Sequence, residues 1–234
     1  MLTQLKVQVF RILRHGGLWL IRKAKFEESP AIPSLAGDRD IENSWVLAEI
    51  GHGPGEALDF GCGRNSLGLT VARRGYNVTV IDLEPVWWPY IMPNFHFIQG
   101  DLFKANFIPQ SFDLIINCST VEHIGLAGRY GITENREDGD LEAMSYLWNI
   151  TKPNGTMILT IPVGQDAVFA PLHRVYGRER LPRLLERWEV KRKEYWAKDS
   201  QNRWILADES TALGWKSSSA CYGLGLFVLQ RRLD

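Results

Sequence analysis

Short apolar runs alternate along the chain with segments in which apolar residues recur every three or four positions. The runs are rich in β-branched and aromatic residues and predict strands at 57–60, 77–81, 95–99, 112–118, 156–162, 188–195 and 222–230. The other segments predict helices over 40–50, 67–74, 141–151 and 178–188. Because strands that alternate with helices build a sheet covered on both faces, the pattern predicts an α/β fold.

The first 26 residues follow a different pattern. Apolar residues between Leu2 and Leu13 lie on one helical face, and six basic side chains occur with no acid. The apolar run at 18–21 is too short to span a membrane, and no signal-peptide cleavage site follows it. Such a helix either packs on the domain with its charges in water or lies on an anionic membrane surface. We expect residues 1–39 to form this basic extension and a linker, and residues 40–234 to form one domain.

The first strand-helix-strand unit carries a glycine-bearing turn. Its first strand runs into Asp59-Phe60-Gly61-Cys62-Gly63, a helix follows, and the second strand ends at Asp82. Glycines let a ligand approach the backbone, and the helix N-terminus beyond them offers free N–H groups. A carboxylate 21 residues after Gly61 can accept hydrogen bonds from ribose hydroxyls. The unit therefore predicts a nucleoside-bearing cofactor. Ser66 stands where the third glycine of G-x-G-x-x-G would pack, which disfavours a dinucleotide.

The turn resembles motif I of the class I S-adenosylmethionine-dependent methyltransferases, which have D-x-G-x-G at this place. The residues that match are Asp59, Gly61 and Gly63. The resemblance implies a doubly wound, mostly parallel seven-stranded sheet with an antiparallel last strand, and S-adenosylmethionine as cofactor. It also implies cofactor contacts after later strands, at Asp82, Leu83, Asp101, Leu102 and Ser119. The segments 119–131 and 172–181 are similar to a poorly characterised bacterial branch of this family.

Charge and cysteine content narrow the function further. Lys+Arg and Asp+Glu both number 27, so no net field attracts nucleic acid, and a nucleic-acid substrate is not expected. The three cysteines lie far apart with neither disulfide nor metal-site spacing, which fits a reducing, cytoplasmic compartment. The basic extension adds the alternative of a membrane-peripheral location. Four acids lie between 134 and 140, but they lack the spacing of a cation-binding loop, and we expect no metal.

Four polar residues are candidates for the acceptor side. His123 follows the fourth strand, and His173, Arg174 and Tyr176 follow the fifth, where the resembled family keeps its acceptor pocket. Histidine takes up a hydroxyl proton near neutral pH, and arginine holds a carboxylate or phosphate. We therefore expect O-methylation of a small-molecule or glycan acceptor, with either histidine as base and Arg174 and Tyr176 binding the acceptor. The alternatives are a non-catalytic cofactor-binding or scaffold protein and an NAD-dependent oxidoreductase.

Overall fold

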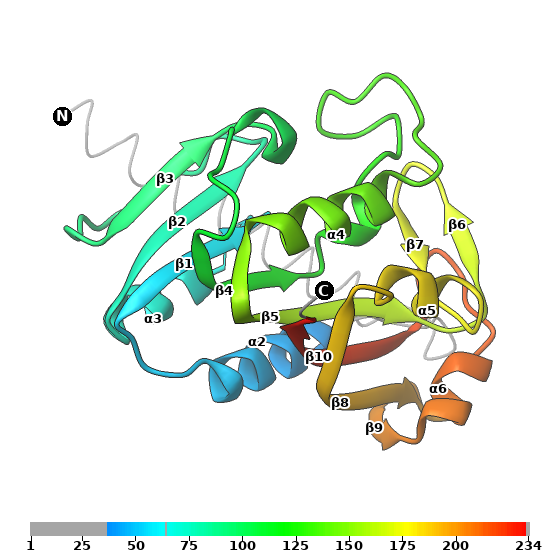
Figure 1. Ribbon diagram of the computed structural model, residues 1–234. Coiled ribbons are helices and arrows are strands. Elements are labelled where there is room, and N and C mark those ends of the chain that lie inside the picture. The colour runs from blue at the N-terminus through cyan, green and yellow to red at the C-terminus, as the bar shows by residue number, and fades with distance from the viewer. Residues whose placement is uncertain (1–36, 64, 233–234) are drawn as a thin grey trace, which may run out of the picture. The chain divides into compact units, whose positions relative to one another are not determined.

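The computed structural model describes residues 37–63 and 65–232, so the predicted basic extension at 1–26 lies outside the described residues. Within them, eight strands form one sheet in the order β3-β2-β1-β4-β5-β10-β8-β9 (Figure 1). The strands are β1 Gly55–Phe60, β2 Tyr76–Asp82, β3 Phe95–Gln99, β4 Phe112–Cys118, β5 Thr151–Val163, β8 Trp188–Lys198, β9 Trp204–Ala207 and β10 Gly223–Arg231. None of the described helices is long and apolar enough to cross a membrane.

The sheet is parallel over its first five strands and antiparallel beyond them. β3, β2, β1, β4 and β5 pair in parallel. β10 pairs antiparallel with both β5 and β8, and β9 pairs antiparallel with β8. β4 and residues 157–163 of β5 are nearly continuous apolar runs because both of their faces are covered. The predicted mostly parallel sheet with an antiparallel last strand is confirmed.

The sheet has one strand more than the seven that the sequence pattern predicts. β9 is a run of four apolar residues in an otherwise polar segment, and all four are at least partly exposed where the strand pairs with β8. The run is too short for its apolar pattern to indicate a strand rather than isolated anchoring residues. β8 therefore lies one place inside the sheet edge, because β9 is the edge strand. The predicted helix over 178–188 is also shorter, because the chain turns after Leu184 to enter β8 at Trp188.

Helices cover both faces of the sheet, as predicted. They are α2 Asp38–Glu49, α3 Leu67–Arg73, α4 Gly139–Ile150, α5 Arg180–Leu184 and α6 Glu209–Gly214. α2 and α3 pack in one buried core with Val78 and Ile116 of the sheet. α4, α5 and α6 contribute to a second core, which contains Leu58 and Ile115. Figure 1 shows α4 and α5 on the side of the sheet opposite to α2 and α3.

Short elements follow the carboxyl ends of the parallel strands. The 3-10 helix η1, Leu102–Lys104, follows β3, and the 3-10 helix η2, Val121–His123, follows β4. Beyond β5 the chain forms a small hairpin of β6, Ala167–Phe169, and β7, His173–Val175. These connections lie at the edge of the sheet where open α/β folds bind ligands.

Candidate active site

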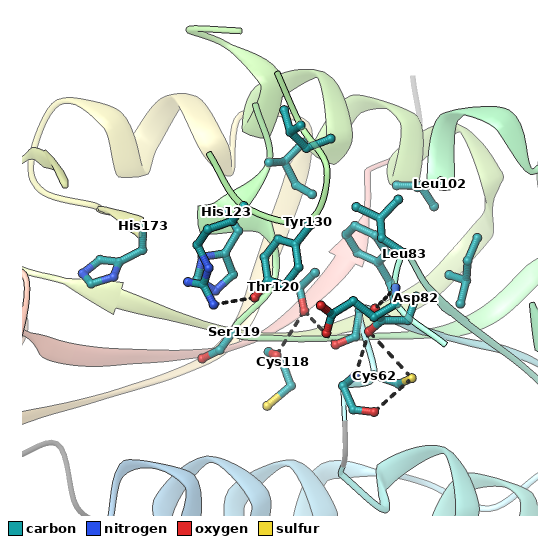
Figure 2. Close-up of a pocket in the computed structure, with 18 of the residues that line it drawn as sticks. Cys62, Asp82, Leu83, Leu102, Cys118, Ser119, Thr120, His123, Tyr130 and His173 are labelled. Carbon is teal, nitrogen blue, oxygen red and sulfur yellow. Dashed lines mark hydrogen bonds between the residues drawn. The ribbon is translucent and has the colours of Figure 1, made fainter. Parts of the chain in front are cut away.

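A cavity of about 700 Å³ lies at the carboxyl ends of the parallel strands. Its walls come from the segments after β1, β2, β3 and β4, the loop before α4, the β6–β7 hairpin and the segment before β10. Figure 2 shows Thr120 between Asp82 on one side and His123 and His173 on the other. Its volume and position are those of a small-molecule site.

The turn after β1 is shaped so that a ligand can approach its backbone. Gly61 and Gly63 have φ angles of 68° and 52°, which favour glycine. A Cβ atom at Gly61 would collide with the side chain of Thr120, whereas one at Gly63 would meet no atom within 4 Å from the described residues other than its chain neighbours. The open space beside Gly63 is where the backbone can receive a cofactor.

Two carboxylates stand at the same end of the cavity. The Oδ2 atom of Asp82 accepts a hydrogen bond from the Gly63 N–H at 2.8 Å, and its Oδ1 atom accepts one from the Glu84 N–H at 2.9 Å. Asp101 accepts a hydrogen bond from the Phe103 N–H at 3.0 Å. Each carboxylate keeps lone pairs for the hydroxyl or amino groups of a nucleoside. The predicted cofactor residues that line the cavity are Gly61, Gly63, Asp82, Leu83, Asp101, Leu102 and Ser119.

Asp59, also predicted as a cofactor contact, does not line the cavity. Its side chain is buried, and its Oδ2 atom accepts a hydrogen bond from the Gly68 N–H of α3 at 2.9 Å. Burial raises the pKa of Asp59 to about 7. Asp59 thus connects the first turn of α3 to β1, the two elements that flank the glycine turn.

His123 stands at the other end of the cavity with one ring nitrogen already engaged. Its Nδ1 atom lies 2.5 Å from the carbonyl oxygen of Leu172, so Nδ1 carries the proton and Nε2 carries the lone pair. Its Nε2 atom lies 3.7 Å from Oε1 of Glu122. Burial lowers the pKa of His123 to about 4 and raises the pKa of the Glu122 carboxyl to about 8. Both side chains are therefore neutral at pH 7.

His173 also lines the cavity, from β7. Its ring packs edge-on against Tyr222, with the ring centroids 5.0 Å apart. The side chain is buried, and its Nε2 atom has no hydrogen-bond partner in the described part of the chain. Burial lowers the pKa of His173 from its ordinary value. A buried nitrogen without a partner can accept a hydrogen bond from a ligand.

Arg174 and Tyr176, predicted to bind the acceptor, do not line the cavity. Neighbouring residues of a strand face opposite sides, so Arg174 turns away from the cavity that His173 lines. Its guanidinium donates to the carbonyl oxygens of Arg136 and Glu137 at 3.0 and 3.1 Å and lies 3.7 Å from Asp140. The Tyr176 hydroxyl donates to Asp140 at 3.1 Å. Both side chains therefore belong to a buried polar network, and the structure places neither of them at the cavity, where the sequence predicted that they bind the acceptor.

The sequence does not point to a buried residue behind the cavity wall or to two residues within the wall. Glu42 of α2 lies behind the wall and connects the ends of β4 and β5, because it accepts hydrogen bonds from the Ser119 hydroxyl and, at 2.7 Å, from the Thr160 hydroxyl. Arg129 and Tyr130 line the cavity from the loop before α4. Glu42 precedes its partners by 77 and 118 residues, so no local pattern could have found it.

Solved structures with the same fold share little sequence with this chain. Residues 57–134 match the model of a methyltransferase domain. The 1,6-didemethyltoxoflavin-N1-methyltransferase of Burkholderia thailandensis, crystallised with S-adenosylhomocysteine, is 15% identical, with 97% of this chain and 87% of that chain covered at a TM-score of 0.53. The N-methyltransferase NodS of Bradyrhizobium japonicum is also 15% identical, with 85% and 89% covered at a TM-score of 0.54. The [4+2]-cyclase SpnF is 16% identical, with 88% and 86% covered at a TM-score of 0.57.

The described residues thus have the fold of class I S-adenosylmethionine-dependent methyltransferases, and residues 57–134 match a methyltransferase domain. No curated protein matches the chain. The chain belongs to the family described as "Caenorhabditis protein of unknown function, DUF268", whose model matches residues 101–220, just over half of its length. That match includes η2, the loop before α4 and the β6–β7 hairpin, which form the end of the cavity opposite to the glycine turn.

Proposed function

We propose that the protein transfers the methyl group of S-adenosylmethionine to a hydroxyl group of a small-molecule or glycan acceptor. The observation that carries this proposal is the continuous cavity. It joins the glycine turn and Asp82 at one end to His123 and His173 at the other. One ligand bound at each end would meet the other inside the same enclosed space, and alignment of two reactants is the main contribution that such a site makes.

The cofactor end of the cavity has the donors and acceptors that the cofactor needs. The Gly63 backbone is open to the cavity, and the carboxylates of Asp82 and Asp101 can accept hydrogen bonds from a ribose and an adenine amino group. When bound, S-adenosylmethionine supplies a methyl group on a positively charged sulfur. The protein then has to hold the acceptor oxygen in line with the methyl carbon and keep competing water out.

A neutral imidazole can take the proton that the acceptor hydroxyl must lose. As the new C–O bond forms and the C–S bond breaks, the hydroxyl proton becomes strongly acidic, so even a weak base is sufficient. The Nε2 atom of His123 carries a lone pair because Nδ1–H is bound to the Leu172 carbonyl. The Nε2 atom of His173 has no partner within the described residues and is the second candidate. Neither needs to lose a proton first at pH 7, because burial lowers the pKa of both.

The first experiment asks whether the protein binds the cofactor through Asp82. Calorimetric titration of the full chain with S-adenosylmethionine, and separately with NAD, should show saturable binding of the sulfonium cofactor only. Asp82→Ala and Asp82→Asn should weaken that binding, while Glu189→Gln, an exposed change on β8 outside the cavity lining, should not. Preferential NAD binding would instead support the oxidoreductase alternative.

The second experiment asks which atom receives the methyl group. The protein is incubated with methyl-labelled S-adenosylmethionine and panels of sugars, phenols and amines, and labelled products are characterised by NMR. We expect the label on oxygen; a label on nitrogen, as the names of two structural neighbours suggest for those proteins, would overturn the hydroxyl proposal. Absence of any acceptor-dependent transfer would favour a non-catalytic protein.

The histidine variants identify the base. His123→Gln or His173→Gln, whichever removes the base, should lower turnover by about two orders of magnitude or more while cofactor affinity is kept. His96→Gln is the matched control, because His96 is exposed on β3 and does not line the cavity. Full activity in both single variants would show that neither histidine is the base.

A further inference from the structure

The charged residues that line the cavity are divided between its two ends. Acidic side chains, Asp82, Glu84 and Asp101, belong to the segments after β2 and β3. Three arginines line the cavity as well, Arg39 of α2 and Arg129 and Arg136 of the loop before α4. An arginine that faces a ligand site is either neutralised by a protein carboxylate or available to an anionic ligand.

Two of the three arginines are neutralised within the protein. Arg39 forms an ion pair with Glu42 at 2.7 Å, and Arg136 forms one with Glu142. Among the residues that the structure describes, Arg129 forms no ion pair. Its contacts are to neutral groups: one terminal nitrogen donates to the Tyr130 hydroxyl at 2.8 Å and the other to the Leu172 carbonyl oxygen at 3.5 Å. The charge of Arg129 is therefore not compensated within this part of the chain.

Arg129 lies next to the candidate base. The Leu172 carbonyl oxygen that receives the Arg129 hydrogen bond also lies 2.5 Å from Nδ1 of His123. The Tyr130 ring completes the group: the guanidinium carbon of Arg129 lies 4.7 Å from its centroid, and the His123 and Tyr130 centroids are 6.1 Å apart. A guanidinium has five N–H donors, and these contacts occupy two of its nitrogens only in part. A ligand atom held by Arg129 would thus stand within a few ångströms of His123.

We infer that the acceptor carries an anionic group, a carboxylate or a phosphate, which Arg129 binds beside the hydroxyl that is methylated. This inference rests on the proposed function of the cavity. It assigns Arg129 the anion-binding role that the sequence suggested for Arg174, which is buried and engaged elsewhere.

The electrostatics of the cavity favour an anionic acceptor. The cofactor brings a positive sulfonium into the cavity that already holds the positive charge of Arg129, and like charges in an enclosed site repel each other. A carboxylate or phosphate between them offsets that repulsion. The Arg129 charge also adds to the effect of burial in lowering the pKa of both His123 and His173. An anion bound to Arg129 would weaken this second effect and make the base stronger only when the acceptor is present.

The test measures anion binding without turnover. The full chain, saturated with S-adenosylhomocysteine, is titrated with inorganic phosphate, methyl glucuronide or the uncharged methyl glucoside, and the ring signals of His123 and His173 are followed by NMR. We expect saturable shifts with at least one anion and none with the glucoside. The anion that binds more tightly identifies the group as a phosphate or a carboxylate.

Three variants connect the response to Arg129. Arg129→Gln should weaken anion binding about tenfold or more, in line with the loss of a charge-assisted hydrogen bond, and Arg129→Lys should retain part of it. Arg183→Gln is the control, because Arg183 is an exposed arginine on α5 outside the cavity lining. No saturable response in the parent protein, or an equal response in Arg129→Gln, would overturn the inference. This test does not measure methyl transfer, so its result is independent of the labelling experiment described above. If the anion binds here and the label in that experiment is found on nitrogen, the hydroxyl proposal is rejected while the anion site is supported.

Discussion

Three buried carboxyl groups stand directly behind residues that line the cavity. Burial raises the pKa of Asp59 to about 7 and that of Glu122 to about 8, and it also raises the pKa of Glu42. Removing a charged carboxylate from water is costly, so burial favours the protonated form of all three groups, but the charge of Arg39 opposes this effect at Glu42. Glu42 and Asp59 have hydrogen-bond partners for their oxygens, whereas Oε2 of Glu122 has none in the described part of the chain.

Glu122 should make the protein less stable as the pH rises. Between its ordinary pKa of 4.5 and its folded value of about 8, the folded chain keeps a proton that the unfolded chain releases, so the free energy of unfolding falls with pH over this window. Each pKa unit corresponds to about 1.4 kcal/mol. Glu122→Gln keeps the shape of the neutral side chain and removes the titration. Urea unfolding at several pH values from about 5 to 8 should therefore show a shallower fall for Glu122→Gln than for the parent protein.

The control for this prediction is Glu189→Gln, in which an exposed carboxyl on β8 is removed. Its pH profile should follow that of the parent protein. If the Glu122→Gln profile also ran parallel to the parent profile, Glu122 would not hold its proton in the folded state. Asp59 titrates in the same direction, so part of the fall should remain in Glu122→Gln.

The sequence indicates which residues reach the cavity where their positions depend on one local segment. Gly61, Gly63 and Asp82 belong to one strand-helix-strand unit whose geometry follows from its own sequence, and all three line the cavity. The direction of Arg174 depends on the register of the β6–β7 hairpin, which the sequence pattern did not show. The sequence did not point to Arg129, because only the folded structure shows which cavity arginines pair with carboxylates.

At the scale of elements, a buried ionic network joins α4, β7 and α5. Asp140 at the start of α4 receives hydrogen bonds from Arg180 of α5 at 2.9 Å and from Tyr176 at 3.1 Å, and it lies 3.7 Å from Arg174 of β7. Asp140 and Arg174 are 0% and 2% exposed, so neither charge is stabilised by water. The network holds the β6–β7 hairpin, and therefore His173, against the helix layer.

Loss of Arg174 should destabilise the protein strongly. Arg174→Ala leaves Asp140 with one cationic partner fewer and removes the hydrogen bonds that Arg174 donates to three backbone carbonyl oxygens, of which that of Ile124 has no other donor among the described residues. We therefore expect the free energy of unfolding to fall by about 3–5 kcal/mol. Arg183→Ala removes an arginine of the same region that is 56% exposed, and it should change stability by no more than about 0.5 kcal/mol. Urea unfolding of the two variants measures the difference.

Measuring the cofactor affinity of Arg174→Ala distinguishes a stabilising role of Arg174 from the acceptor-binding role that the sequence suggested. Folded Arg174→Ala should bind S-adenosylhomocysteine normally, because Arg174 does not line the cavity. A small effect of Arg174→Ala on stability, combined with weaker acceptor binding, would restore the predicted substrate role.

Long apolar runs were predicted well, and short elements in a mostly polar segment were not. β4 and residues 157–163 of β5 are nearly continuous apolar runs, so their sequences mark them. β9 and α6 lie in the mostly polar segment between Lys198 and Lys216, for which the pattern predicts no element. Both are short: β9 has four residues and pairs with β8, and α6 has six residues, of which Ala212 and Leu213 are buried.

For the described part of the molecule, the order of the strands explains where the cavity lies. From β1 the chain winds outward through β2 to β3, then returns to place β4 on the other side of β1 and β5 beyond it. The connections after β1 and β4 therefore diverge and leave a crevice at the carboxyl ends of these neighbouring strands. The glycine turn follows β1 and η2 with His123 follows β4, so this one topological feature brings the cofactor end and the candidate base together.

The charge of the whole chain is balanced overall but unevenly distributed. Residues 1–26 contain six basic residues and no acid, which leaves 21 basic against 27 acidic residues in the remainder. Basic residues near an anionic membrane contribute about 1 kcal/mol each to binding, and salt screens the attraction within about 10 Å.

If residues 1–26 bind such a surface, the full chain should sediment with phosphatidylserine-containing vesicles at low salt and be released at high salt. Deleting residues 1–26, or replacing their six basic residues by glutamine, should abolish sedimentation. Absence of sedimentation by the full chain would contradict membrane-surface binding and leave the alternative, an extension packed on the domain.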